Sequence, residues 1–227
     1  MISLSAILAI TGYMAKPRLF VPGLSHHVYH RGNNRTDVFH DDEDRTVFLL
    51  LLGNAAERGD VSIHSWTLMT NHYHALVTAP NEHALPRMMQ RLGRSYVRYF
   101  NARHKRTGTL WEGRYQASLV IDERYWLHCL RYIETNPVAA NMVDSPDKYR
   151  WTSFRHHGLG LSDPLISSHP LFDAIGDSAQ RRQAEWREAC ACPLPAEDVA
   201  LITEALRTNS ELHRPGFARL LRKKPAA

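Results

Sequence analysis

The amino-acid sequence predicts an α+β fold of the split βαβ, or ferredoxin-like, class, in which two helices cover one face of an antiparallel sheet. Two observations carry this prediction. Strand-like and helical hydrophobic patterns follow one another in the order strand, helix, strand, strand, helix, strand, helix. Hydrophobic residues make up 44% of the 227 residues and charged residues 22%, which suffices for a buried core and excludes wholesale disorder.

The first half of this pattern predicts a strand, a helix and a hairpin. Residues 24–31 (LSHHVYHR) alternate β-branched and aromatic side chains and stop at a Gly-Asn-Asn turn. A helix through Arg58 follows three aspartates, because acidic residues stabilise a helix N-terminus. Residues 61–68 and 72–78 are strand-like, and the two residues between them predict a hairpin turn.

The second half predicts a helix, a strand and a final helix. Residues 84–103 have a helical pattern, and residues 116–121 (QASLVI) form the next strand. Asp122 is a suitable N-cap for a third helix. We expect that helix to end before Asn136 and Pro137, because a residue that precedes proline is disfavoured in the α region. Such a sheet has a second face that is open to nucleic acid or to a site roofed by the extra helix.

The chain divides into a main domain, residues 14–157, and two appendages. Residues 1–13 form an N-terminal extension whose apolar run is too short to cross a bilayer. No basic residue precedes Lys16, so a translation start at Met14 is favoured over an export or membrane role. Residues 158–227 are rich in proline and predict a helical extension with a basic tail, its helices at 179–189 and 195–207.

The cysteines and the net charge of the sequence indicate which classes of protein it can belong to. The three cysteines, Cys129, Cys190 and Cys192, have neither the number of a disulfide framework nor zinc spacing, which indicates a reduced, cytoplasmic protein. The formal net charge is +5 and the pI about 9.2, a modest excess whose distribution matters more than its sum.

Two histidines of the second hairpin strand are candidate metal ligands. Residues two apart on a strand point to the same face, so His72 and His74 project together while Tyr73 faces the other way. Two neutral imidazoles supply two ligands of a metal site, which still needs a third. The alternative is a pair of surface histidines, because the motif is short and the chain has 14 histidines.

The predicted third helix offers the remaining ligand. Tyr132 and Asn136 are four residues apart and therefore share a helix face. Two imidazoles with one amide oxygen suit Mg²⁺ or Mn²⁺ better than a closed zinc site. The alternatives are a tyrosine that packs its ring on the sheet and an asparagine that caps the helix before proline.

The predicted second helix carries a stripe of basic residues. Its spacings of four, three and four place four arginines along one side: Arg87, Arg91, Arg94 and Arg98. No acidic residue interrupts the run through residue 106, whereas a solvated helix face, the alternative, usually mixes both signs. We expect the stripe to bind a nucleic-acid backbone together with Arg103, Lys105, Arg106 and Arg114. Aromatic residues that interleave with it are expected to stack on bases: Tyr96, Tyr99 and Phe100.

Taken in order, these segments resemble the single-tyrosine HUH transposases, and within them the REP-associated tyrosine transposases of bacteria. The resemblance covers residues 16–157 and rests on HRGNNRTDVFHDDEDR, TNHYHALV, GTLWEGRYQASLV, LRYIETNPVAANMV and YRWTSF. The segment HPLFDAIGDSAQRRQAEWREA also looks like an extension found in some members. One departure is Thr70, where most relatives have proline; it loosens the hairpin turn and removes no ligand.

The resemblance implies a role for each candidate residue. His72 and His74 match the pair that binds a divalent metal, Mg²⁺ or Mn²⁺, and Asn136 matches the polar residue that completes the site. Tyr132 matches the nucleophile. Members cleave single-stranded DNA beside a hairpin and leave a 5′-phosphotyrosine and a free 3′-hydroxyl. Among the other tyrosines Tyr125 is the main rival for that role, because it lies about two helical turns before Tyr132.

The sequence therefore predicts a metal-dependent DNA nickase and strand transferase that acts on single-stranded or hairpin DNA in the bacterial nucleoid. Two other functions stay open, a nucleic-acid-binding regulator without catalysis and a phosphodiesterase that hydrolyses with water. We expect no membrane partner and no nucleotide cofactor, since the chain has no Gly-x-x-x-x-Gly-Lys loop. A homodimer is not excluded.

Overall fold

The computed structural model describes residues 20–212, so the predicted N-terminal extension and basic tail lie outside the described residues. Its strands are β1 (Ser25–Arg31), β2 (Ser62–Leu68), β3 (His72–Thr78), β4 (Gln116–Val120) and β5 (Glu211–Leu212). Its α-helices are α2 (Asp42–Glu57), α3 (Ala84–Arg103), α4 (Glu123–Ala139), α5 (Phe154–His157), α6 (Pro170–Asp173), α7 (Ala179–Ala191) and α8 (Ala196–Thr208). Two 3₁₀ turns are η1 (Asn33–Arg35) and η2 (Pro146–Lys148).

The strands form one sheet in the order β2-β3-β1-β4-β5. The first four are antiparallel neighbours, with Tyr29 opposite His74 and Arg31 opposite His72. This order confirms the predicted ferredoxin-like class. The sequence pattern did not predict β5, a two-residue strand that pairs parallel with the edge strand β4.

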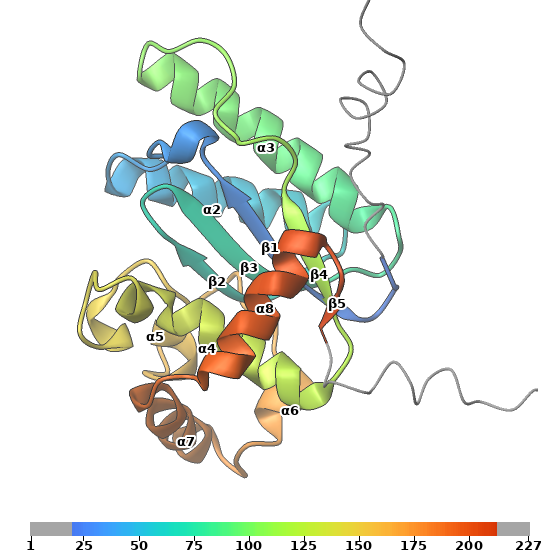
Figure 1. The fold of residues 1–227 in the computed structure, drawn as a ribbon, viewed down its shortest axis with the longest axis vertical. Coiled ribbons are helices and arrows are strands. Elements are labelled where there is room, and N and C mark those ends of the chain that lie inside the picture. The colour runs from blue at the N-terminus through green and yellow to red at the C-terminus, as the bar shows by residue number, and fades with distance from the viewer. Residues whose placement is uncertain (1–19, 213–227) are drawn as a thin grey trace, which may run out of the picture.

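Helices cover both faces of the sheet (Figure 1). α2 and α3 pack on one face, where Tyr73 contacts Phe48 of α2 and Met89 of α3. α4 and α8 lie across the other face. Because side chains alternate along a strand, His27 and Tyr29 of β1 face α4 together with the residues opposite them on β3, Leu76 and His74.

The helix starts follow the predicted chemistry. The Asp41 carboxylate accepts the Glu43 and Asp44 amides at the start of α2, and the Asp122 carboxylate accepts the Arg124 amide at the start of α4. Both carboxylates therefore satisfy backbone donors that no helical bond reaches.

The end of α4 corrects the prediction. The helix continues through Asn136 and Pro137 to Ala139, and the Ala140 amide closes it by donating to the Asn136 carbonyl. Proline lacks an amide proton, so the Ile133 carbonyl loses one helical bond, but this loss falls in the last turn. Pro137 is buried, and its packing outweighs the preference of the preceding residue for extended backbone.

The segment after residue 158 packs against the rest of the molecule through a buried carboxylate. Glu134 of α4 is fully buried and accepts hydrogen bonds from Ser153 Oγ (2.5 Å), His157 Nδ1 (2.6 Å) and Trp186 Nε1 of α7 (2.7 Å). A buried carboxylate needs such partners, so this network joins α5 and α7 to α4. Among residues 20–212, no helix has the length and apolar character needed to cross a membrane.

Candidate active site

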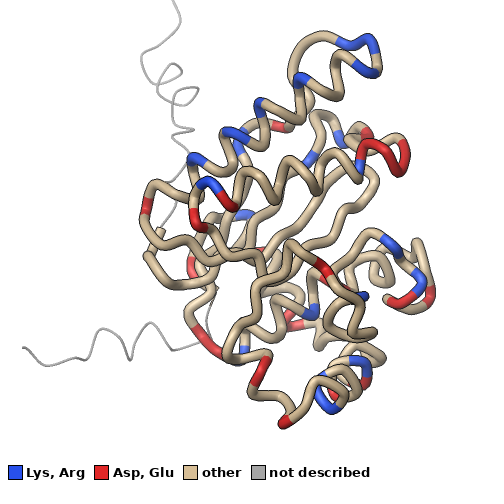
Figure 2. The backbone as a smooth tube through the Cα atoms, turned by 180° about the vertical axis from the view of Figure 1, so that it is seen from behind, with Lys and Arg blue, Asp and Glu red and all other residues tan. Residues whose placement is uncertain are grey.

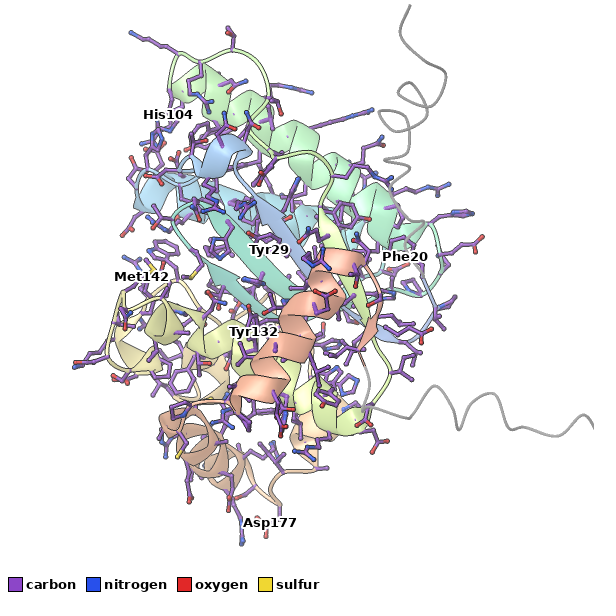
Figure 3. The ribbon with its side chains drawn as sticks, viewed as in Figure 1. Phe20, Tyr29, His104, Tyr132, Met142 and Asp177 are labelled. Atoms are coloured by element: carbon purple, nitrogen blue, oxygen red, sulfur yellow. The ribbon has the colours of Figure 1, made fainter. Side chains whose placement is uncertain are left out.

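The predicted site residues lie together in one pocket of about 580 Å³ between the sheet and the helices α4 and α8. His72, His74, Tyr132 and Asn136 all line it. Figure 3 shows Tyr132 and Tyr29 near each other beside α8, with His104 at a distant end of the molecule. The remaining walls come from β1, the loop before β4, β4 and α8: Tyr29, His30, Arg31, Glu112, Arg114, Gln116, Thr203, Leu206 and Arg207.

His72 is oriented by its neighbour in the hairpin turn. Asn71 donates its Nδ2 to the Arg35 carbonyl (3.1 Å), which fixes the amide so that Oδ1 faces His72 Nδ1 at 2.6 Å. An amide oxygen only accepts, so His72 must donate through Nδ1. Its Nε2 then carries the lone pair that a metal requires.

His74 is held from the opposite side by a third histidine. His27 Nε2 lies 2.8 Å from His74 Nδ1, and the two side chains are buried. The other ring nitrogen of His74, Nε2, lies 3.5 Å from the Asn136 amide nitrogen. The imidazole of His74 therefore spans the distance from β1 to α4.

Tyr132 completes the group. Its ring centroid lies 5.6 Å from that of His74 and 5.7 Å from that of His27, both in edge-on contact. Its hydroxyl forms hydrogen bonds with Thr203 of α8 and with Asn136. Since α4 does not end before proline, Tyr132 and Asn136 lie one helical turn apart on the face that covers the histidines.

Burial favours the uncharged forms of the three histidines and of Tyr132. Burial lowers the pKa of His27 to about 3 and that of His72 to about 4, where Arg31 adds a smaller effect. Burial also holds the pKa of His74 well below its ordinary value, and the rings of His27 and His72 act in the same direction. Burial raises the pKa of Tyr132, opposed by its hydrogen bonds with Thr203 and Asn136. All three imidazoles are thus neutral at pH 7, and Tyr132 is a phenol.

The donor set fits a divalent cation. Neutral imidazole is the metal-binding form, and His72 presents an unprotonated Nε2 because Asn71 takes up its other nitrogen. Asn136 contacts both rings, which brings an amide oxygen within reach of the same ion after rotation of the amide. Two nitrogens and one oxygen that leave other positions open suit Mg²⁺ or Mn²⁺ bound together with a substrate.

The basic stripe lies apart from this pocket. Arg87, Arg91, Arg94 and Arg98 are exposed along α3, and Figure 2 shows the row of basic residues on that helix. None of the four forms an ion pair with an acidic residue in the described part of the chain. α3 covers the sheet face opposite to α4, so Arg114 is the predicted DNA-binding residue that lines the pocket.

Two parts of the stripe prediction change in the structure. Tyr96 and Phe100 are fully buried beneath α3 and cannot stack on bases, which corrects that part of the prediction; Tyr99 is half-buried and bonds to Asp44. Arg103 lies 2.7 Å from Asp41 and 2.6 Å from Asp44, so acidic groups balance its charge.

The rival nucleophile Tyr125 lies outside the pocket. It is buried against α8, where it forms a hydrogen bond with Asp198. Tyr125 does not line the pocket that holds Tyr132 and the two histidines of β3, and it lies seven residues before Tyr132 on α4.

Several residues that line the pocket, and His27 buried beneath it, were not predicted. His27 and Arg31 lie on the same face of β1 as Tyr29, and the alternation of LSHHVYHR carries the signal for this. Arg31 pairs with Glu112 at 2.6 Å. Thr203 and Arg207 come from α8, far along the chain, and only the packing of that helix brings them to the site.

A second group of ligand-type side chains lies at the other end of the sheet. His40, Asp44 and His104 place ligand atoms within 4.8 Å of one another. The Asp44 carboxylate already receives Arg103 at 2.6 Å and His104 Nε2 at 3.0 Å, in addition to the His40 amide at 2.8 Å. Its lone pairs are therefore engaged, and we interpret the group as an ion-pair clasp between α2 and the end of α3.

Comparison with known proteins identifies relatives. Residues 20–136, slightly more than half of the chain, match the family model described as "Transposase IS200 like". No curated protein matches the sequence. A solved REP-associated tyrosine transposase bound to a REP hairpin matches with a TM-score of 0.52 at 14% identity, over 67% of this chain and 90% of that one.

Two further solved structures are more distant. A candidate transposase of Deinococcus radiodurans has a TM-score of 0.38 at 23% identity, over 54% of this chain and 97% of that one. The tRNA(His) guanylyltransferase of Saccharomyces cerevisiae has a TM-score of 0.42 at 9% identity, over 83% and 88%. The family match and the first structure confirm the resemblance drawn from the motifs and the HUH type of the fold.

Proposed function

This chain belongs to the family of IS200-like transposases, and on that premise we propose that it is a metal-dependent single-stranded DNA endonuclease and strand transferase. The proposal assigns Tyr132 as the nucleophile and His72, His74 and Asn136 as ligands of Mg²⁺ or Mn²⁺. The observation that supports it best is the convergence of the four side chains on one pocket, although Tyr132 and Asn136 lie far along the chain from the histidine pair (132 − 74 = 58 and 136 − 72 = 64 residues at the extremes).

The proposed reaction is a transesterification. The Tyr132 oxygen forms a bond to the scissile phosphorus, and the bond from phosphorus to the 3′ oxygen breaks. The phenol proton passes to solvent, and the departing 3′ oxygen takes up a proton, so the products are a 5′-phosphotyrosine and a free 3′-hydroxyl. Because one phosphodiester replaces another, the 3′-hydroxyl of a second strand can reverse the step without ATP.

The protein's own groups prepare this step in three ways. A phenol whose pKa is raised by burial is a weak nucleophile, so its orientation by Thr203 and Asn136 matters. Arg31 and Arg114 line the pocket and supply positive charge for the phosphate. The chemistry that a divalent cation supplies when bound is polarisation of the phosphate oxygens.

The α3 stripe is proposed to hold the DNA backbone. Arg87 and Arg98 are eleven residues apart, which at 1.5 Å per residue is about 16 Å, or roughly five base steps of 3.4 Å. The solved REP-associated tyrosine transposase is bound to a REP hairpin, and a hairpin has a duplex stem of the kind that such a stripe fits. We therefore propose hairpin DNA with single-stranded flanks as the substrate.

The test is covalent capture of DNA by the full-length protein. A pool of hairpin oligonucleotides with randomised flanks, labelled at the 3′ terminus, is incubated with the protein and Mn²⁺ and separated in denaturant. We expect a labelled protein band, because the fragment that keeps the 3′ label is the one joined to Tyr132. Tyr132→Phe should abolish the band, and the matched control Tyr125→Phe should retain it.

Two outcomes would contradict the proposal. Cleavage that survives in Tyr132→Phe would indicate hydrolysis by water. Binding of the pool by the wild-type protein without cleavage or adduct would indicate a regulator that has no nuclease activity.

A further inference from the structure

His27 is the most deeply buried polar group of the pocket region, and the reaction proposed above gives it no role. It has no exposed surface, and it lies on β1 diagonally across from His74, whose direct partner on that strand is Tyr29. Its Nε2 is 2.8 Å from His74 Nδ1, whereas its Nδ1 has no hydrogen-bond partner among residues 20–212. A buried imidazole with one nitrogen unpartnered costs free energy, so its retention calls for an explanation.

The contact between the two rings allows only two arrangements of protons. In a neutral imidazole one nitrogen donates and the other accepts. If His27 Nε2 donates, His74 must carry its proton on Nε2, which removes the lone pair that faces Asn136. If His74 Nδ1 donates, its Nε2 lone pair faces Asn136 and the pocket, and the unpartnered Nδ1 of His27 carries a proton.

We propose that His27 is a positioning residue that accepts the Nδ1 proton of His74 and so directs the His74 Nε2 lone pair toward the metal site. The proposal rests on the proposed function, because it concerns the ligand that the reaction uses. It also has a parallel in the same pocket, where Asn71 accepts the Nδ1 proton of His72. Both ligands would then be held as the same tautomer from behind, one by an amide and one by an imidazole.

The ring contacts add orientation to this effect. His27 packs edge-on against Tyr132 at 5.7 Å and lies tilted against His74 at 5.0 Å between ring centroids. It therefore touches the proposed ligand and the proposed nucleophile at once. Loss of its nitrogen should alter the tautomer of His74, and loss of its volume should alter the position of Tyr132.

The first test is Mn²⁺ affinity, measured by calorimetry on the full-length protein without DNA. His27→Leu removes the acceptor, and we expect Mn²⁺ to bind about 10- to 100-fold more weakly, the range typical of lost ligand-supporting hydrogen bonds. His27→Gln restores an acceptor near the position of Nε2 and should recover most of the affinity. The matched control is His26→Leu, which removes the adjacent buried histidine on the other face of β1 and should leave the affinity unchanged.

The second test is the tautomer of His74, measured by long-range ¹H–¹⁵N NMR on the metal-free protein. The wild-type protein and His27→Gln should carry the His74 proton on Nδ1, and His27→Leu should shift it toward Nε2. A wild-type His74 protonated on Nε2, or unchanged Mn²⁺ affinity in folded His27→Leu, would overturn the proposal. If His27→Leu fails to fold, the position of the His74 proton in the wild-type protein and in His27→Gln still tests the proposal.

The two tests separate this proposal from the proposed function. A wild-type protein that binds no Mn²⁺ but carries the His74 proton on Nδ1 contradicts the metal site and supports the His27 contact. A wild-type protein that forms the DNA adduct with His74 protonated on Nε2 supports the function and contradicts the role of His27.

Discussion

At the scale of single residues, the pocket depends on which nitrogen of each histidine carries its proton. Asn71 determines that His72 carries its proton on Nδ1, because the Asn71 amide is itself fixed by a hydrogen bond to the Arg35 carbonyl. The hairpin turn that presents Asn71 is in turn held by backbone bonds, in which the Thr70 carbonyl accepts the Val38 and Phe39 amides. These bonds involve the backbone alone, so threonine in place of proline leaves the turn anchored.

A ligand variant gives the residue-scale prediction. His72→Ala should reduce nicking by about 100-fold or more, because it removes a proposed metal ligand, while hairpin binding through α3 stays largely intact. Nicking is measured by gel and binding by fluorescence anisotropy. The control is His156→Ala, whose imidazole bonds to the Leu161 carbonyl away from the pocket. Equal losses of binding and nicking would instead indicate that His72 is structural.

At the scale of elements, α3 has two faces of different function. One face buries Met88, Leu92, Tyr96 and Phe100 at intervals of four, and this apolar side packs on the sheet. The other carries the arginine stripe. Tyr96 and Phe100, two of the three aromatic residues that the sequence suggested for base stacking, fall on the buried side because they share the period of the core.

Charge reversal on the stripe gives the element-scale prediction. Arg91→Glu with Arg94→Glu should weaken hairpin binding and reduce the slope of log K against log salt by about 1 to 2, since each lost phosphate contact removes roughly 0.7 to 0.9. Binding is titrated at several salt concentrations. The control, Arg124→Glu with Arg181→Glu, changes net charge equally on exposed positions of α4 and α7. An unchanged slope in the stripe variant would remove α3 from the interface.

At the scale of the whole molecule, two groups of charged side chains join segments that are distant in sequence. Glu134 ties the C-terminal helices to α4, and through that packing α8 becomes a wall of the pocket. The clasp formed by Asp41, Asp44 and Arg103 joins the start of α2 to the end of α3. Both lie outside the pocket: Glu134 fixes helices on the pocket side of the sheet, and the clasp fixes the two helices on the opposite face.

The clasp makes stability depend on acid pH. The hydrogen bonds from Arg103 lower the pKa of Asp41, and the pKa of Asp44 is also lowered, because hydrogen bonds from His104, the His40 amide and Arg103 outweigh its burial. A carboxylate whose folded pKa lies below its unfolded value of about 3.9 stabilises the protein above that value. This stabilisation is lost as the pH falls through the folded pKa.

A neutral variant tests this dependence. Between pH 5 and pH 3 the Tm of wild type should fall more steeply than that of Asp41→Asn, which keeps a good N-cap but loses the charge. At pH 7 the difference in Tm should be small, no more than about 2–4 °C, because solvent screens the exposed Asp41–Arg103 pair. The control is the exposed Asp37→Asn. Parallel melting curves for wild type and Asp41→Asn would exclude the clasp as the source.

Local chemistry made much of this protein predictable from sequence. The alternation of strands, the aspartate caps of α2 and α4 and the same-face spacing of His72 and His74 act over a few residues, so a linear pattern carries them. The same holds for Tyr132 and Asn136, one helical turn apart. The family motifs added the order in which these segments follow one another along the chain.

Tertiary packing alone decided the rest. Three features differ from what the local sequence favours, because the energy of tertiary contacts exceeds the local preference. They are the continuation of α4 through Pro137, the burial of Tyr96 and Phe100, and the pairing of Arg103 with acidic groups. The entry of α8 into the pocket and the contact of His27 with His74 join residues far apart in the chain. Sequence by itself predicted the two histidines, the tyrosine and the asparagine of the site; the fold determined that they meet and which further residues join them, because contact between distant segments is set by the shape of the core.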